Sequence, residues 1–234
     1  MKKLSIIIPA YNESKSIQKV IRSLHEKADG FDYVIVNDCS TDDTEALLQS
    51  SGFNYISFSS NLGIGGAVQA GYKYAKQMHY DIAVQMDGDG QHDPLYLREL
   101  VKPVESGDAD MTIGSRFIQK TGFQSSGLRR LGIKFINFVI KLCCGKKIHD
   151  STSGFRACNA ALIHYFADHY AQDYPEPDAI VSAFLNGWSI QEVPVNMHER
   201  NEGVSSISSM KSIYYMIKVP LSLLLHKASI GRKR

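Results

Sequence analysis

Residues 81–93 read DIAVQMDGDGQHD, a largely apolar run that passes directly into a glycine-rich turn carrying three carboxylates. The apolar run predicts a short buried strand. In the turn only Gly88 separates Asp87 from Asp89, so both carboxylates can face one cation while the glycine lets the backbone come close to a ligand. Gln91 can add a neutral oxygen. Hard oxygen ligands of this kind favour Mg²⁺ or Mn²⁺.

A calcium loop of the EF-hand type is the obvious competitor for this turn. It is disfavoured because Gln91 and His92 occupy the fifth and sixth positions, where Asp or Asn and then Gly are required, and no Glu stands at the twelfth. A plain Asp-rich turn remains the alternative. Magnesium and manganese sites usually leave ligand positions to substrate phosphates, so the turn favours a site for a metal and a diphosphate.

The segments around this turn alternate between strand and helix patterns. Strands are expected at residues 4–8, 33–36, 54–58, 81–86 and 110–113, and helices at 14–27, from about 41, at 67–78 and from Pro94. This order predicts an α/β fold with a mostly parallel central sheet and helices on both faces. After Gly114 the pattern becomes irregular and more helical.

Polar clusters follow four of the expected strands, at residues 9–13, 37–38, 61–66 and 87–91. Because ligands gather at the carboxyl ends of parallel strands, the clusters predict one shared site. Asp38 can accept hydrogen bonds from a nucleoside, or can cap a helix that begins near Thr41. Residues 63–66 lack the Lys-Ser/Thr of a P-loop and the dinucleotide fingerprint, so a tight turn into a helix is favoured.

Composition excludes several classes of protein. The 234 residues suit one large domain, and a net charge of +2 gives no indication of a nucleic-acid partner. Four cysteines in an irregular arrangement form neither a disulfide framework nor a zinc site, which indicates reduced, cytoplasmic thiols (Cys39, Cys143, Cys144 and Cys158). The first apolar run is broken at Pro9, so no signal peptide is expected, and no run is long enough for a membrane-spanning helix.

Several motifs occur in a recognisable order over roughly the first 210 residues. They read IPAYNE (8–13), VNDCSTDDT (36–44), NLG (61–63), DGD (87–89), GSRF (114–117), DSTSGFRA (150–157) and VPVNMHERNEGVSS (193–206). With these motifs the chain resembles a family 2 glycosyltransferase of the GT-A fold. Within that family it is most similar to the dolichyl- or polyprenyl-phosphate sugar transferases.

The resemblance implies a role for each matching residue. The nucleotide of a sugar-nucleotide donor would lie against Pro9, Tyr11, Glu13, Val36 and Asp38. The DGD turn, with Gly88 at its centre, would hold the divalent cation and the donor diphosphate through Asp87, Asp89 and Gln91. Arg116 and Arg200 would neutralise donor or acceptor phosphate, and Asp150 would lie near the acceptor. The implied reaction is a direct, inverting displacement in which the metal stabilises the departing nucleoside diphosphate.

Two departures affect the donor and the acceptor. Ser206 stands where the dolichyl-phosphate mannose enzymes have a lysine, which favours a UDP-sugar over guanosine-linked mannose. Glu176 lies eleven residues before Gly187, the spacing of a catalytic base in members that glycosylate hydroxyls. A lipid phosphate is already ionised and needs no base. The alternative for Glu176 and Asp178 is a structural role at a helix start.

The acceptor therefore stays open at this point. We favour a polyprenyl phosphate. The first alternative is a saccharide hydroxyl, either lipid-linked or in polysaccharide assembly. A nucleotidyltransferase is a weaker alternative, and a nucleotide-binding module without catalysis is weaker still.

Two apolar stretches, 127–142 and 212–225, each end in a basic cluster and raise the question of a membrane. Such segments can lie in the headgroup plane of anionic lipid, or pack on the sheet, on a second subunit or on a small membrane partner. We divide the chain into a glycosyltransferase domain, 1–206, and an amphipathic basic tail, 207–234. The expected location is peripheral, on the cytoplasmic face of the cell membrane.

Overall fold

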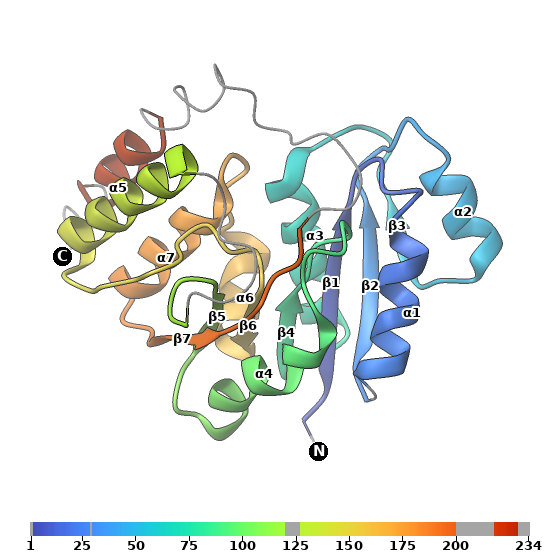
Figure 1. Cartoon of the computed structure of the whole chain (residues 1–234), viewed down its shortest axis with the longest axis horizontal. Coiled ribbons are helices and arrows are strands. Elements are labelled where there is room, and N and C mark those ends of the chain that lie inside the picture. Colours follow the sequence, from blue (N-terminus) through green and yellow to red (C-terminus); the bar gives the residue numbers. More distant parts are fainter. Residues whose placement is uncertain (1, 29, 120–126, 200–217, 229–234) are drawn as a thin grey trace.

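The computed structural model describes residues 2–28, 30–119, 127–199 and 218–228, without the side chains of residues 128 and 129. A seven-stranded sheet with strand order β3-β2-β1-β4-β6-β5-β7 forms the centre of the molecule (Figure 1). Its strands are β1 (Leu4–Ala10), β2 (Asp32–Asn37), β3 (Tyr55–Ser57), β4 (Ile82–Gln85), β5 (Met111–Ser115), β6 (Arg156–Asn159) and β7 (Ile190–Pro194). The mostly parallel α/β fold expected from the sequence is confirmed.

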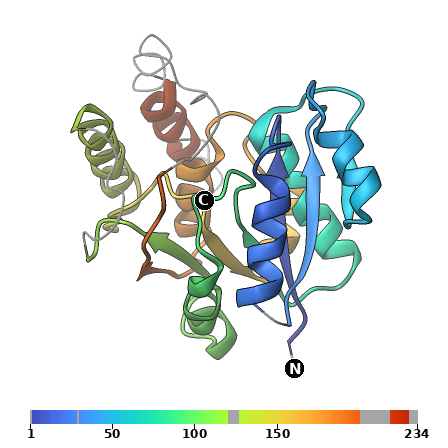
Figure 2. The same ribbon diagram turned by 45° about the vertical axis from the view of Figure 1, so that its right-hand side comes forward.

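Helices cover both faces of the sheet, and the sequence shows why. Strands buried on both sides consist of nearly continuous apolar residues, as in β1, where all seven residues are buried. Ile7 points into one core, and Ile6 and Ile8 point into the other. The Ile7 core contains residues of α3 (Gly63–Gln77), α5 (Gly127–Cys144), α6 (Ala160–Asp168) and α7 (Pro175–Leu185). The opposite core contains residues of α1 (Ile17–Lys27), α2 (Thr44–Ser51) and α4 (Leu97–Ser106). Figure 2 gives a second view of these layers.

After Gly114 the chain is more helical, as expected, with α5, α6 and α7, but it also contains two strands that were not predicted, β6 and β7. β6 runs antiparallel between β4 and β5, and β7 lies parallel to β5 at the edge of the sheet. β6 contains a buried arginine, Arg156, whose guanidinium donates to the carbonyl oxygens of Ser153 and Glu176. A charged residue in a four-residue strand hides the apolar pattern on which strand prediction depends.

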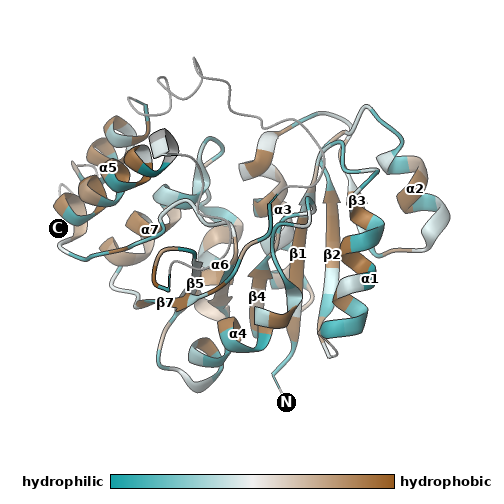
Figure 3. Ribbon diagram, viewed as in Figure 1, coloured by the Kyte–Doolittle hydropathy of each residue, from teal (hydrophilic) through white to brown (hydrophobic). Residues whose placement is uncertain are grey.

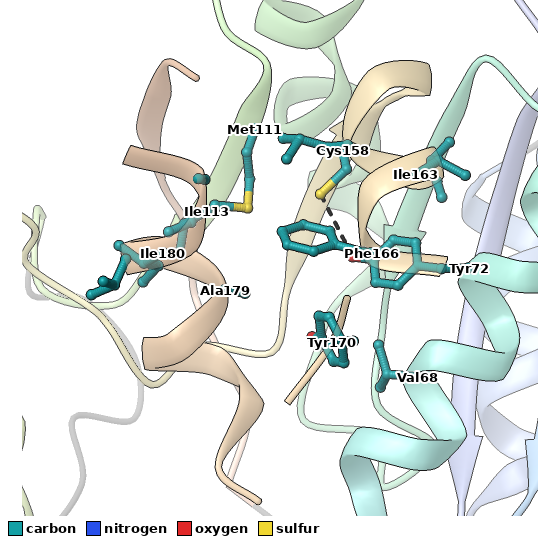
Figure 4. Close-up of a cluster of buried hydrophobic side chains, with 14 of the residues drawn as sticks. Val68, Tyr72, Met111, Ile113, Cys158, Ile163, Phe166, Tyr170, Ala179 and Ile180 are labelled. Atoms are coloured by element: carbon teal, nitrogen blue, oxygen red, sulfur yellow. Dashed lines mark hydrogen bonds between the residues drawn. The ribbon is translucent and has the colours of Figure 1, made fainter. Parts of the chain in front are cut away.

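Aromatic side chains fill the core beneath α3, α6 and α7 (Figure 4). The rings of Tyr72 and Phe166 lie 5.3 Å apart, and the Tyr72 hydroxyl lies 3.6 Å from the sulfur of Cys158. Burial raises the pKa of the Cys158 thiol to about 11. All four cysteines are free thiols, and Cys158 is therefore a packing residue here.

Residues 218–228 form a helix that lies beside α5. Lys227 Nζ donates to the carbonyl of Leu142 at 3.0 Å, and the Cys143 thiol donates to that of Leu223 at 3.8 Å. His226 Nδ1 lies 3.0 Å from a carboxylate oxygen of Asp178 on α7, and this contact raises the pKa of His226. Within the described residues, no helix is long and apolar enough to cross a membrane. The rest of the tail, 207–217 and 229–234, lies outside them, as does Ser206.

Candidate active site

The candidate site lies where β1, β2 and β4 end, at the upper edge of the sheet in Figure 1. β1 has β2 on one side and β4 on the other, so the chain order reverses there, and a crevice for ligands is expected at such a point. Pro9 and Val36 are register partners on β1 and β2, and the N–H of Asp38 donates to the carbonyl of Ala10 at 2.9 Å. Tyr11 is 48% exposed. The nucleotide-binding residues suggested by the resemblance are therefore neighbours.

Asp38 links the end of β2 to the start of α3. Its side chain is 3% exposed, and its Oδ1 accepts from the N–H of Leu62 at 2.7 Å. The alternative that it caps the next helix is wrong, because α2 begins at Thr44 with Asp43 as its N-cap residue. Glu13 is held through its main chain, because its N–H donates to the Thr44 hydroxyl at 2.9 Å.

The glycines at 63–66 lie in the first turn of α3 itself, which begins at Gly63, so the predicted tight turn before a helix at 67–78 is corrected. Gly63 has a φ of +76°, a conformation that glycine adopts without strain. Gly65 lets another segment approach, because a Cβ there would lie 2.2 Å from the carbonyl oxygen of Ala171. The smallest side chain is therefore required at this contact.

The DGD turn brings two carboxylates to this edge of the sheet, directly after β4. Gly88 packs against β1, so closely that an added Cβ would lie 3.2 Å from the carbonyl oxygen of Pro9. Asp89 Oδ1 accepts from the N–H of Gln91 at 3.0 Å, and Gln91 Nε2 donates to the carbonyl of His198 at 3.4 Å. Asp87 Oδ1 is buried and has no hydrogen-bond partner among the described residues.

These residues fit a divalent cation that substrate would help to hold. Within the described part of the chain, no three His, Cys, Asp or Glu side chains form a metal cage. Mg²⁺ and Mn²⁺ are commonly held by one or two carboxylates together with substrate phosphates, so two aspartates and an amide are sufficient. A buried carboxylate oxygen without a donor needs an explanation, and a cation provides one.

Arg116 and Asp150 form a buried ion pair below the end of β5. Arg116 Nε and Nη2 each donate to Asp150 at 2.7 Å, one to each carboxylate oxygen. The two side chains are 8% and 0% exposed. Glu192 of β7 accepts from the N–H of Asp150 at 2.9 Å. The loop that starts at Asp150 then reaches Asp87, because a Cβ on Gly154 would lie 3.0 Å from the Asp87 carboxylate.

Glu176 lies in the first turn of α7, and its carbonyl oxygen accepts a hydrogen bond from Arg156. Burial raises the pKa of its carboxyl group, the charge of Arg156 opposes that shift, and the charge of Asp87 adds to it. A raised carboxyl pKa beside a second carboxylate is typical of functional sites, although structural networks produce it too. Arg200 lies outside the described residues.

The sequence alone assigns no role to Arg156 or Gly154, although both belong to the DSTSGFRA motif. Arg156 is fully buried, and it joins the loop before β6 to the first turn of α7 through its bonds to Ser153 and Glu176. A glycine and an arginine inside a recognised motif were the available signal. Their roles depend on contacts between distant segments, which the motif alone does not specify.

Residues 5–166 match the sequence profile of a family described as glycosyl transferase family 2. The chain belongs to that family. It is therefore a glycosyltransferase, and the GT-A fold suggested by the resemblance is confirmed.

Two relatives illustrate the family. The chain is 32% identical over 225 residues to polyprenol monophosphomannose synthase of Mycolicibacterium smegmatis, covering 92% of this chain and 84% of that protein. It is 28% identical to UDP-N-acetylglucosamine–dolichyl-phosphate N-acetylglucosaminyltransferase of Methanococcus voltae, covering 96% and 98%.

A solved structure has the same fold. Glucosyl-3-phosphoglycerate synthase from Mycobacterium tuberculosis, in complex with Mn²⁺, uridine diphosphate and phosphoglyceric acid, superposes with a TM-score of 0.72. The two proteins are 22% identical, and the match covers 97% of this chain and 78% of that one.

Proposed function

We propose that this glycosyltransferase moves a sugar from a nucleoside-diphosphate sugar, with UDP as the favoured nucleotide, to a polyprenyl phosphate at the cytoplasmic membrane face. The observation that carries the proposal is the buried Oδ1 of Asp87, which has no hydrogen-bond partner among the described residues and lies at the switch point of a family 2 sheet. The names of two relatives support the acceptor, since both specify a polyprenol or dolichyl phosphate product or substrate.

For the donor, Asp38 is the main candidate to bind the nucleoside. Its Oδ1 already accepts from the N–H of Leu62, which helps to fix the orientation of the carboxylate, and we assign its other oxygen to a ribose or base. Tyr11, exposed above the crevice, offers a ring for the base to contact. Ser206 in place of the lysine favours UDP, and the solved relative with UDP and Mn²⁺ supports the same choice.

Asp87, Asp89 and Gln91 would hold a Mg²⁺ or Mn²⁺ ion together with the donor diphosphate. When bound, the ion supplies positive charge that stabilises the departing nucleoside diphosphate. Gly88 contributes by letting the turn lie directly against Pro9, which brings the cation site next to the nucleotide site.

On the acceptor side, an ionised phosphate oxygen would attack the anomeric carbon as the bond from that carbon to the diphosphate breaks, which inverts the configuration. No proton has to be removed. Arg200 and Arg116 are the proposed phosphate-binding cations. For Arg116 this role requires sharing its guanidinium, because both oxygens of Asp150 already accept from it. We assign Asp150 the role of orienting that arginine near the acceptor.

A saccharide hydroxyl is the second candidate acceptor, and one observation favours it. Burial, with a smaller contribution from the charge of Asp87, raises the pKa of Glu176, which is the direction expected for a general base. An attacking hydroxyl would lose its proton to that carboxylate, and loss of the base would cost about 10²- to 10⁴-fold in rate.

Replacing the two acids of α7 distinguishes these acceptors. We expect Glu176→Gln and Asp178→Asn each to keep transfer to polyprenyl phosphate within about threefold of the wild-type rate, because an ionised phosphate requires no base. The measurement is the initial rate with polyprenyl phosphate and, in parallel, with saccharide acceptors. A loss of 100-fold or more for Glu176→Gln, with a saccharide as the better wild-type acceptor, would establish the second candidate instead.

A membrane contact is the remaining part of the proposal. On α5 a row of apolar side chains three or four residues apart is exposed, namely Leu131 (66%), Phe135 (44%), Phe138 (61%) and Leu142 (60%). We call it the α5 stripe. The opposite side of α5, including Ile136 and Ile140, is buried in the core. Packing on this molecule's own sheet therefore accounts for only one side of the helix.

The helix 218–228, which lies beside α5, also exposes Leu221, Leu224 and Leu225, each by more than 40%. Figure 3 shows apolar and polar residues side by side on α5, at the outer end of the molecule. α5 contains no acidic residue, and Lys134, Lys141 and Lys146 are exposed on it or just after it. Apolar side chains flanked by cations match an anionic lipid surface better than a second copy of the same basic face.

Vesicle binding tests this contact. We expect the protein to sediment with vesicles that contain phosphatidylglycerol, and Phe138→Glu to bind at least tenfold more weakly, because the change adds charge to the apolar side. Met78→Glu is the matched control, since Met78 is 42% exposed at the end of α3 and away from the α5 stripe. Equal loss in both variants, or no binding by the wild type, would contradict the membrane contact.

A further inference from the structure

His92 lies directly behind Asp87 in the DGD turn. Its Nδ1 accepts a hydrogen bond from the main-chain N–H of Asp87 at 3.0 Å. Its Nε2 lies 3.9 Å from Oδ2 of the same aspartate. The side chain is almost completely buried, so this histidine faces the turn and not the solvent.

The position of the His92 ring is fixed by Phe155. The two rings are stacked, with centroids 4.9 Å apart and planes inclined by 14°. Phe155 is 1% exposed and follows Gly154, which packs against the Asp87 carboxylate. The main chain of His92 also pairs with Met197. The loop before β6 and the segment before residue 200 therefore both hold the histidine against Asp87.

A purely apolar ring could fill this space, but it could not accept a hydrogen bond from the main-chain N–H of Asp87. That N–H lies in a tight turn, partly buried, and would lose its hydrogen bond if the histidine were replaced by a phenylalanine. The bond fixes the backbone from which the Asp87 carboxylate projects. Groups that orient a metal ligand in this way commonly change metal affinity by 10- to 100-fold when they are removed.

We infer that His92 is a positioning residue that aligns the Asp87 carboxylate for the cation and diphosphate of the donor. The inference rests on the proposed function, because it presupposes that Asp87 is a ligand. His92 itself touches neither the cation nor the sugar in this account. It acts through the main chain of Asp87, with Phe155 keeping the ring in place.

Three substitutions of His92 test the inference. For each variant, titration calorimetry measures the dissociation constant for Mn²⁺ in the presence of UDP. His92→Phe keeps a flat ring for Phe155 but removes the acceptor, and we expect a dissociation constant for Mn²⁺ roughly 10- to 100-fold higher. His92→Asn can place its amide oxygen close to the position of Nδ1, and binding should stay within about threefold of wild type. His92→Gln places its amide nearer to the position of Nε2, and should resemble His92→Phe.

The comparison also separates this inference from the proposed function. If the wild-type protein binds no Mn²⁺ with UDP, the proposed function itself fails. If the wild type binds and all three variants bind equally well, Asp87 is a ligand but His92 does not position it. Equal weakening in H92N and H92Q would also contradict the inference, because it would show that the ring is needed only for packing. Should H92F not fold, which thermal unfolding without metal reveals, the H92N and H92Q pair decides.

Discussion

The Asp87→Asn variant should transfer sugar roughly 10²- to 10³-fold more slowly than the wild type, a loss of about 3–4 kcal/mol in transition-state stabilisation. Asparagine has nearly the same shape, so the turn keeps its form. It carries no charge for the cation, and one of its two terminal atoms becomes a hydrogen-bond donor. The rate is measured under saturating donor and acceptor with Mn²⁺ or Mg²⁺.

Stability distinguishes this effect from misfolding. The buried Oδ1 of Asp87 has no partner among the described residues, so removing the charge should leave the thermal midpoint of the metal-free protein unchanged or higher. Asp81→Asn is the matched control, because Asp81 precedes the opposite end of the same strand, where its Oδ2 accepts from the N–H of Lys3. Activity of D87N within threefold of wild type would remove Asp87 from the site.

The second large effect is expected on stability. Arg116→Met should lower the free energy of unfolding by about 3–5 kcal/mol, because it leaves the fully buried carboxylate of Asp150 without its counter-charge. Replacing both partners, in Arg116→Met with Asp150→Leu, should recover most of that loss, since two apolar side chains leave no buried charge. Urea unfolding of the single and double variants measures the cycle.

A surface pair serves as the control for this cycle. Lys76 and Asp168 also form an ion pair, with a distance of 2.7 Å, but their side chains are 36% and 58% exposed. Lys76→Met should therefore leave the unfolding midpoint within experimental error. If R116M is equally harmless, the pair does not hold the acceptor-side loop, and its place in the proposed site has to be reconsidered.

The parallel half of the fold could be predicted because its signal is local. β1 is a continuous apolar run, and α1 shows its buried residues at helical spacing, so each element is visible within a short window. β6 could not be found in this way. It inserts antiparallel between β4 and β5, and Arg156 is tolerated there only because distant carbonyl groups accept from its guanidinium. Such contacts have no local sequence signature.

In the candidate site, too, the features with a local sequence signal could be predicted, and those that depend on contacts between distant segments could not. The strand-end rule brought Asp38 and Asp87 to one edge of the sheet, where the structure places them. The rule could not show that Arg116 would bind Asp150, 34 residues later, because that pairing depends on how β5 and the loop after α5 meet. The role of Glu176 stays a prediction, and Arg200 lies outside the described residues.

The most direct test is to incubate the protein with polyprenyl phosphate, Mn²⁺ and a panel of nucleoside-diphosphate sugars, and to identify the products by mass spectrometry. We expect two products: a polyprenyl phosphate that carries one sugar, and one molecule of nucleoside diphosphate for each sugar transferred, which is UDP for the preferred donor. Chelation of the metal should stop the reaction. Release of pyrophosphate, or no transfer of a sugar to polyprenyl phosphate from any donor of the panel, would contradict the proposed function.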